Sequence, residues 1–295
     1  MPLENAELII DDPALREVVL DAVVAGPDDG EPVLLLHGWP QTSLEWSRVI
    51  PALAESGMRC LAPDQRGYSP AVRPDDVASY ELPHLVDDAL GALDAVGWES
   101  AHIVGHDWGA VVAWALAAQH PERARSLTAV SVPHPQAFNK ALKSDPVQWK
   151  KSAYLALFRT APGKAAKVLM ADGGKRLRDV YGTVVDPSDV DQYVAFFSEE
   201  GAMEAALRWY AAMGGDHFKE IGPVAVPTTF IWGTEDVAIG AQAARGSGEW
   251  CTGPYSLVVL NGRGHWIPDE EPEAVVAAVL GLAGRGPGAR PGDAP

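Results

Sequence analysis

Three short segments carry the residue types that nucleophilic catalysis requires. The first, Gly105-His106-Asp107-Trp108-Gly109, lies between an apolar run typical of a strand and a stretch typical of a helix. Glycines two positions before and after Asp107 permit the sharp, strained strand-to-helix turn that exposes a nucleophile at the edge of a sheet. Asp107 is therefore the candidate nucleophile. The alternative is that its side chain only caps the following helix.

Two later residues complete a candidate catalytic triad with Asp107. Asp236 follows the apolar run that ends at Trp232, and His265 follows the run that ends at Leu260, in a glycine-rich loop. Nucleophile, then acid, then histidine is the chain order of one known triad type. We expect Asp236 to orient His265, and His265 to act as the general base.

The segment His37-Gly38-Trp39-Pro40 follows the first apolar run that predicts a buried strand. A loop at this place can aim the backbone N–H of Trp39 at the same point as the N–H of Trp108, so that the two form an oxyanion hole. Pro40 removes a donor and can stiffen the loop through a cis bond. His37 and Pro40 are also candidate substrate contacts.

An aspartate nucleophile favours displacement at a saturated carbon. Its carboxylate is ionised at neutral pH and needs no base before it attacks a carbon that carries a leaving group. The product would be an alkyl ester of Asp107, which water activated by His265 would hydrolyse at the carboxyl carbon. A conventional esterase is disfavoured, because attack by Asp107 on an acyl group would give a mixed anhydride.

Strands that alternate with helices must position these segments. Apolar runs at 33–36, 58–62, 101–104, 126–132, 228–232 and 256–260 predict strands, and patterns at 43–55, 82–93, 110–119 and from 272 predict helices. The helix after Tyr80 has one apolar face and carries Asp87, Asp88 and Asp94 on the opposite face. The alternation predicts a mostly parallel central sheet flanked by helices.

One stretch interrupts this alternation and divides the chain. From 135 to 215 there are helical runs but no convincing strand, which predicts a helical cap inserted into the sheet-building sequence. The predicted divisions are therefore a core at 1–134, the cap at 135–215, the rest of the core at 216–284, and a disordered tail at 285–295, which is rich in Gly, Ala, Arg and Pro.

Composition limits the partners and the location. Lys and Arg number 23 against 40 Asp and Glu, and the net charge of −17 disfavours nucleic acid and anionic membranes as partners. Two cysteines, Cys60 and Cys251, cannot build a disulfide framework, and both are expected to be buried thiols. With no apolar run long enough to span a bilayer and an acidic N-terminus, we expect a cytoplasmic protein. No phosphate loop, metal-ligand cluster or cofactor motif is evident, so the reaction needs only water.

The combined order and spacing of these motifs resemble the α/β-hydrolase superfamily, and within it the epoxide hydrolases and their dehalogenase relatives, from about residue 16 to 282. The resemblance implies the α/β-hydrolase fold with a helical cap and assigns Asp107, His265 and Asp236 to the triad. It also matches Tyr154 and Tyr210 to two cap tyrosines that hydrogen-bond an epoxide oxygen, although the segment from 154 to 162 is one residue longer than the usual pattern.

Other expectations concern the pocket and the surrounding loops. Trp149 and Trp209 could line an apolar pocket. We expect a small apolar epoxide and water as the reactants. The expected assembly is a monomer or a homodimer. The loop Asp64-Gln65-Arg66-Gly67-Tyr68 resembles a family loop whose geometry an Arg–Asp pair fixes. Asp269-Glu270-Glu271 is interpreted as charge at a helix N-terminus.

Two other functions remain open at this point. Haloalkane dehalogenases also place Trp after the nucleophile, as at Trp108, but often carry Asn where Trp39 stands. Fluoroacetate dehalogenases carry arginines just after the nucleophile, where this chain has none. The same fold could also bind an apolar small molecule without turnover, which retention of all triad members disfavours.

Overall fold

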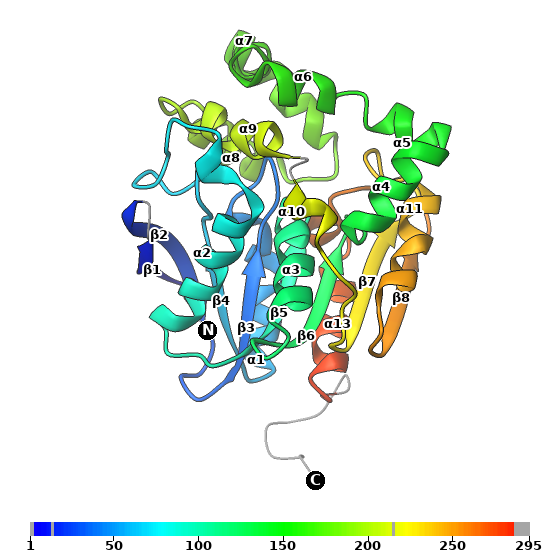
Figure 1. The fold of residues 1–295 in the computed structure, drawn as a ribbon. Coiled ribbons are helices and arrows are strands. Elements are labelled where there is room, and N and C mark those ends of the chain that lie inside the picture. The colour runs from blue at the N-terminus through cyan, green and yellow to red at the C-terminus, as the bar shows by residue number, and fades with distance from the viewer. Residues whose placement is uncertain (1–2, 13–14, 214–215, 286–295) are drawn as a thin grey trace.

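An eight-stranded sheet forms the centre of the fold across residues 3–12, 15–213 and 216–285, which the computed structural model describes (Figure 1). The strand order is β1-β2-β4-β3-β5-β6-β7-β8. The strands are β1 (Glu4–Asp12), β2 (Arg16–Ala25), β3 (Glu31–Leu36), β4 (Met58–Pro63), β5 (Ala101–His106), β6 (Ala124–Val130), β7 (Thr228–Gly233) and β8 (Tyr255–Leu260).

The strands from β4 to β8 pair in parallel, as the sequence predicts. Every residue of β5 and β7 is buried, because helices cover both faces of the sheet and leave no strand face in water. The antiparallel strands β1 and β2 were not predicted. In β1 buried and exposed residues alternate over its second half, so it lacks the continuous apolar run by which the other strands were recognised.

Two groups of helices cover the two faces. Leu34 and Leu36 of β3 pack in the same apolar cluster as α2 and α3, whereas Val33 and Leu35 pack in the cluster that holds α1 and α13. This division follows from the alternation of side chains along a strand. The core helices are α1 (Ile50–Glu55), α2 (Leu82–Ala95), α3 (Trp108–Gln119), α11 (Ala241–Gly246), α12 (Ile267–Glu270) and α13 (Pro272–Leu282), with short 3₁₀ turns at Ser43–Arg48, Ala78–Tyr80 and Ser247–Trp250.

The helices between β6 and β7 are named here the cap, Pro135–Lys219. They are α4 (Pro135–Ser144), α5 (Pro146–Lys151), α6 (Leu155–Thr160), α7 (Pro162–Tyr181, with non-helical backbone from Ala171 to Gly174), α8 (Pro187–Phe197), α9 (Ala202–Ala212) and α10 (Asp216–Lys219). Helices α6 to α9 lie above one end of the sheet (Figure 1). The division of the chain into domains stays a prediction, and residues 286–295 of the predicted tail lie outside the described residues.

A buried ion-pair cluster corrects the interpretation of α2. Asp88, which periodicity places on the polar face, is only 4% exposed. Its two carboxylate oxygens accept hydrogen bonds of 2.7 Å from Nε and Nη2 of Arg66, and Nη2 also donates to Asp12 at 2.6 Å. Arg66 itself is fully buried. The cluster joins the end of β1, the 64–68 loop and α2. The arginine of the loop therefore pairs with aspartates on two other elements, Asp12 and Asp88, and not with one inside the loop.

Two findings bear on the environment of the chain. The described part contains no helix with the length and apolar character that a bilayer crossing demands. Both cysteines are free: Cys60 is buried in β4, whereas Cys251 is only half-buried at the end of a 3₁₀ turn, which corrects the expectation of two buried thiols.

Candidate active site

The turn between β5 and α3 holds Asp107 in a strained conformation. Its backbone has φ 48° and ψ −118°, a region that non-glycine residues rarely adopt. A Cβ on Gly105 would lie 2.3 Å from the carbonyl oxygen of Gly109, and one on Gly109 would lie 1.9 Å from that of Leu36. Both glycines are therefore required for the strand and helix to approach. The Asp107 side chain makes no capping hydrogen bond to α3, so the helix-cap alternative is wrong.

One backbone N–H group of the loop after β3 faces the Asp107 carboxylate. The N–H of Trp39 donates to Oδ1 of Asp107 at 2.9 Å. Gly38 permits this approach, because a Cβ there would lie 2.4 Å from Cβ of Asp107. The peptide bond from Trp39 to Pro40 is cis. Trp108 begins α3, and the N–H groups of a first helical turn have no partner within the helix.

The structure brings Asp107, His265 and Asp236 together at the carboxyl ends of β5, β7 and β8. Nε2 of His265 lies 3.5 Å from Oδ2 of Asp107, and Nδ1 lies 3.2 Å from each carboxylate oxygen of Asp236. All three side chains are buried, with Asp236 fully so. The imidazole therefore connects the two carboxylates, which is the geometry that a general base and its orienting acid require.

Ser131, which sequence reasoning missed, joins the acid and the histidine. Its hydroxyl donates to Oδ2 of Asp236 at 2.5 Å, and its Oγ lies 2.7 Å from Nδ1 of His265. Ser131 directly follows β6 and has a positive φ of 69°. No motif marks it, and the available signal was its place at the end of a predicted strand next to that of Asp107. Its position supports the alignment of His265 from the side opposite Asp107.

The two carboxylates control the protonation of His265. Burial alone would lower the pKa of the imidazole, but the negative charges and hydrogen bonds of Asp236 and Asp107 raise it to about 10. Conversely, burial would raise the pKa of Asp107, and the neighbouring His265 lowers it below the ordinary value. The resting site thus holds an imidazolium between two carboxylates at neutral pH.

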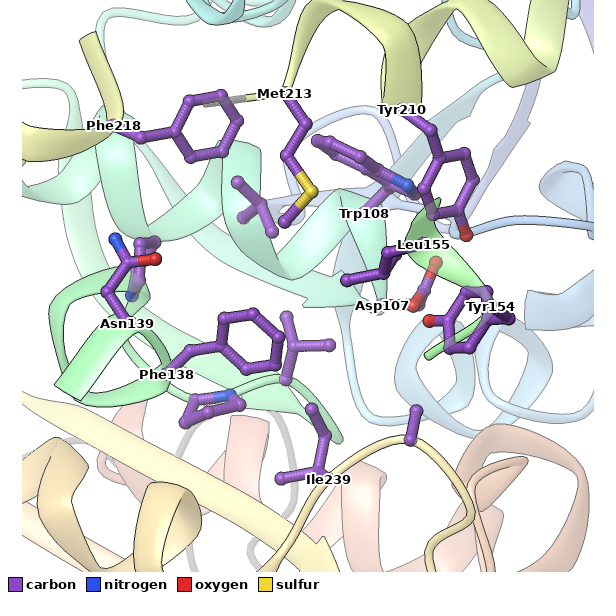
Figure 2. A pocket seen from close by; sticks show the side chains of 15 residues that line it. Asp107, Trp108, Phe138, Asn139, Tyr154, Leu155, Tyr210, Met213, Phe218 and Ile239 are labelled. Carbon is purple, nitrogen blue, oxygen red and sulfur yellow. The ribbon is translucent and has the colours of Figure 1, made fainter. Parts of the chain in front are cut away.

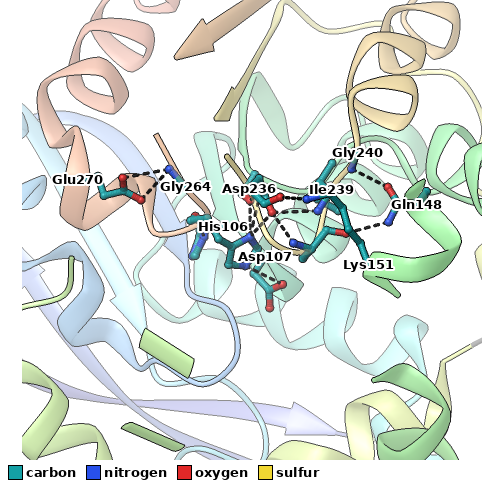
Figure 3. A network of polar contacts seen from close by, with 12 residues as sticks. His106, Asp107, Gln148, Lys151, Asp236, Ile239, Gly240, Gly264 and Glu270 are labelled. Carbon is teal, nitrogen blue, oxygen red and sulfur yellow. Dashed lines mark hydrogen bonds and ion pairs between the residues drawn. The ribbon is translucent and has the colours of Figure 1, made fainter. Parts of the chain in front are cut away.

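Helix α5 of the cap fixes the loop that carries Asp236 (Figure 3). Gln148 accepts a hydrogen bond of 2.8 Å from the N–H of Gly240 and donates one of 2.8 Å to the carbonyl of Ala238. Nζ of Lys151 donates to the backbone carbonyl of Asp236. The N–H groups of Ala238 and of the residue after it donate to Oδ1 of Asp236, which leaves this carboxylate one orientation.

Buried polar groups hold the loop that carries His265. Nε2 of His106 lies 3.0 Å from the carbonyl of His265, and Glu270 accepts two hydrogen bonds of 3.0 Å from the N–H of Gly264 (Figure 3). Asp269 is buried, accepts a hydrogen bond from Gln41, and has its pKa raised by burial to about 6. Asp269 and Glu270 lie in the first turn of α12, as the sequence predicts, and their side chains in addition hold Gln41 and the loop of His265.

An apolar pocket opens onto Asp107 from the cap side. The carboxylate of Asp107 and the rings of Tyr154 and Tyr210 lie together at one end, with both phenol oxygens turned toward Asp107 (Figure 2). Burial and the charge of Asp107 raise the pKa of both phenols, so both are hydrogen-bond donors at neutral pH. The other lining residues are Trp108, Val111, Val132, Pro133, Pro135, Phe138, Asn139, Leu155, Met213, Phe218, Ala238 and Ile239.

The four predicted substrate-binding residues do not line this pocket in the part of the chain that the structure describes, which corrects that prediction. His37 is buried and accepts a hydrogen bond from the backbone of the 64–68 loop, and the carbonyl of Pro40 accepts one from a cap tyrosine. Trp149 is 67% exposed on α5. The buried indole of Trp209 donates to a carbonyl of the 64–68 loop. Amphipathic rings near a site were mistaken for its wall, because sequence does not show which way a ring points.

Over the described ranges, no group of three or more His, Cys, Asp or Glu side chains is arranged to hold a metal ion.

Comparison with known proteins gives consistent matches along most of the chain. Residues 31–272 match the family model described as alpha/beta hydrolase fold. The AB hydrolase superfamily protein YfhM of Bacillus subtilis is 33% identical, over 89% of this chain and 93% of its own length. Epoxide hydrolase A of Mycobacterium tuberculosis is 31% identical, over 93% and 96% respectively. A solved structure described as a novel epoxide hydrolase from metagenomes of hot environments is 30% identical, has a TM-score of 0.83, and covers 96% of this chain and 99% of its own.

Proposed function

The chain belongs to the α/β-hydrolase fold family, and we propose that within this family it hydrolyses epoxides to vicinal diols. The observation that carries this proposal is a buried carboxylate, Asp107, faced by two phenol donors at one end of an apolar pocket. Opening an epoxide needs a nucleophile on carbon and a proton donor for the oxygen that leaves. The site supplies both within one pocket.

The first half-reaction alkylates Asp107. A carboxylate oxygen forms a bond to one ring carbon, the bond from that carbon to the ring oxygen breaks, and the oxygen leaves as an alkoxide on the substrate. Tyr154 or Tyr210 gives this oxygen its phenolic proton. The lowered pKa of Asp107 keeps the nucleophile ionised, and the product is an ester that no longer carries negative charge.

The second half-reaction releases the diol. Esterification removes one of the two charges that hold the proton of His265, so its pKa falls, and this proton restores the phenol through solvent. The neutral imidazole then takes a proton from a water molecule that attacks the carboxyl carbon of Asp107. The N–H groups of Trp39 and Trp108 stabilise the oxyanion. When it collapses, the bond from the carboxyl carbon to the ester oxygen breaks and the proton of the added hydroxyl passes to that oxygen. The diol thus leaves with an oxygen from Asp107, the oxygen of water stays in the regenerated carboxylate, and His265 is again protonated.

The two alternative functions have less support. A haloalkane dehalogenase needs no proton donor for its leaving halide, whereas here two phenols are turned toward Asp107. A binding protein without turnover would not need a histidine that hydrogen-bonds Asp236 and lies within ion-pair distance of Asp107.

Isotope labelling tests the covalent route. In a single turnover in ¹⁸O-water, the diol is expected to carry ¹⁶O in both hydroxyls while the label enters Asp107. With His265→Gln, the alkyl-enzyme is expected to accumulate and to be visible by intact mass. His120→Gln, a substitution far from the site, serves as the matched control and should accumulate no ester. Label in the first-turnover diol, or unchanged turnover in Asp107→Ala, would overturn this mechanism.

The remaining expectations are also proposals. We propose a small apolar epoxide and water as the reactants without cofactor or metal, no nucleic-acid or membrane partner, and a monomer or homodimer in the cytoplasm. The support is the net charge of −17, the apolar lining of the pocket and the two unpaired cysteines.

A further inference from the structure

The reactive groups stand at one end of the pocket and not in its middle. Figure 2 shows Asp107, Tyr154 and Tyr210 together on one side, while the pocket extends away from them toward Phe138 and Asn139. A substrate whose ring reaches Asp107 therefore has room for a side chain in one direction. On the opposite side of the reactive groups, aromatic side chains are packed against the two tyrosines.

Phe158 of α6 fills the space behind the reactive end. Its ring makes edge-to-face contacts with Trp39, Tyr154 and Tyr210, at centroid distances of 5.0, 5.3 and 5.1 Å. Phe158 is 7% exposed and Trp39 is 6% exposed. Both contact the ring of Tyr210, yet neither is among the residues that line the pocket. The pocket thus ends at the tyrosines, with Phe158 and Trp39 packed behind them.

This packing separates two classes of epoxide. In a terminal epoxide one ring carbon carries only hydrogens, so a single substituent must be accommodated. In an internal epoxide both ring carbons carry substituents, which point in opposite directions along the carbon–carbon bond. With the ring oxygen between the two phenols and one carbon at Asp107, the first substituent enters the pocket and the second points to the side where Phe158 packs behind the tyrosine rings. Because the side chains around Phe158 are closely packed, they cannot move aside for a second substituent without a cost in free energy.

We infer that Phe158 is a specificity-determining residue that restricts this protein to terminal epoxides with one apolar substituent. The inference rests on the proposed function for its reaction, but its geometric content concerns the shape of the pocket alone. Phe158 donates and accepts no proton in the proposed mechanism. Its removal should therefore change which substrate is used without removing the chemistry.

Paired substrates that differ by one methyl group test the inference. Wild type is expected to prefer styrene oxide to trans-1-phenylpropylene oxide by ~10- to 100-fold in kcat/KM, the range in which a pocket discriminates one carbon atom. Phe158→Ala is expected to reduce this preference to about 3-fold or less. Phe158→Leu, which keeps more of the packing, should give an intermediate ratio and guards against misfolding of the alanine variant. Leu157→Ala, at the half-exposed neighbouring position on α6, is the matched control and should keep the wild-type ratio.

Binding of the diol products separates this inference from the proposed reaction. Quenching of tryptophan fluorescence should report binding of 1-phenyl-1,2-ethanediol to wild type. The same assay should show that 1-phenyl-1,2-propanediol binds to Phe158→Ala at least ~10-fold more tightly than to wild type. If wild type opens no epoxide but this binding pattern holds, the reaction is wrong and the pocket inference stands. If wild type uses both epoxides equally, or if Phe158→Ala leaves both the kinetic and the binding ratios unchanged, the inference is overturned whatever the reaction.

Discussion

Replacing Asp107 by Asn reproduces the electrostatic effect of the alkyl ester, because both groups are neutral. Oδ2 of Asp107 lies 3.5 Å from Nε2 of His265, and both side chains are buried. Two unit charges at this separation interact by about 4.7 kcal/mol at an effective dielectric constant of 20, which corresponds to roughly 3.5 in pKa. The pKa of His265, about 10 in the intact site, should therefore fall to between ~6 and ~7 in Asp107→Asn.

Titration by NMR of the ¹⁵N-labelled imidazole measures this change directly. The matched control is Asp269→Asn, which neutralises a buried carboxyl that makes no hydrogen bond with His265, and it should lower the pKa of His265 far less. Intact mass must exclude deamidation of the new asparagine, since deamidation would restore Asp107. A His265 pKa in Asp107→Asn within 1 of the wild-type value would refute the argument that Asp107 holds the proton.

The same reasoning fixes the pH dependence of the two half-reactions. The pKa of Asp107 is lowered, so the nucleophile is ionised throughout the neutral range and alkylation should be flat between about pH 5 and 8. Hydrolysis of the ester needs neutral His265 beside an uncharged Asp107. Its rate should therefore rise with pH through ~6 to ~7 and then level. Pre-steady-state fluorescence, with Trp108 beside the reacting group, can separate the two rates.

Three further predictions follow from contacts in the structure. Tyr154→Phe or Tyr210→Phe alone should slow alkylation by ~10- to 100-fold, and the double variant should slow it much more, whereas ester hydrolysis should stay comparatively fast. If the double variant alkylates at the wild-type rate, the two tyrosines only pack and donate no proton. Ser131→Ala should slow ester hydrolysis by ~10-fold with alkylation little changed, because it removes the hydroxyl between the acid and the histidine, and equal slowing of both steps in single-turnover assays would contradict this. Arg66→Met should lower the free energy of unfolding by ~3 to 5 kcal/mol in urea titration, because it removes the positive charge that two buried carboxylates contact. The control Arg123→Met, at a pair whose Asp94 is exposed, should cost less than about 1 kcal/mol. Similar decreases in the free energy of unfolding in these two arginine variants would show that burial of the cluster does not increase its contribution to stability.

The fold class and the meeting of the main reactive residues could be predicted without the structure. Glycines at 105 and 109 encode a turn that admits no side chain, and apolar runs of strand length recur between helical patterns. Since parallel strands end at the same edge of a sheet, residues that follow such runs must meet there. The chain order of Asp107, Asp236 and His265 was therefore enough to predict a cluster whose distances the structure then supplied.

Which polar residues are buried and which rings face the pocket depends on contacts between distant segments, and these could not be predicted. Helical periodicity put Asp88 on a polar face, but Arg66 and the end of β1 cover that face, and no local pattern encodes a contact between distant segments. Ser131 lacked a motif, because a single serine after a strand acquires a role only when two loops close over it. Trp209 was predicted to line the pocket, but its indole N–H donates to the carbonyl of Arg66, and the sequence does not show this direction of the ring. That direction is set by packing of the cap on the sheet, a long-range interaction that periodicity cannot report.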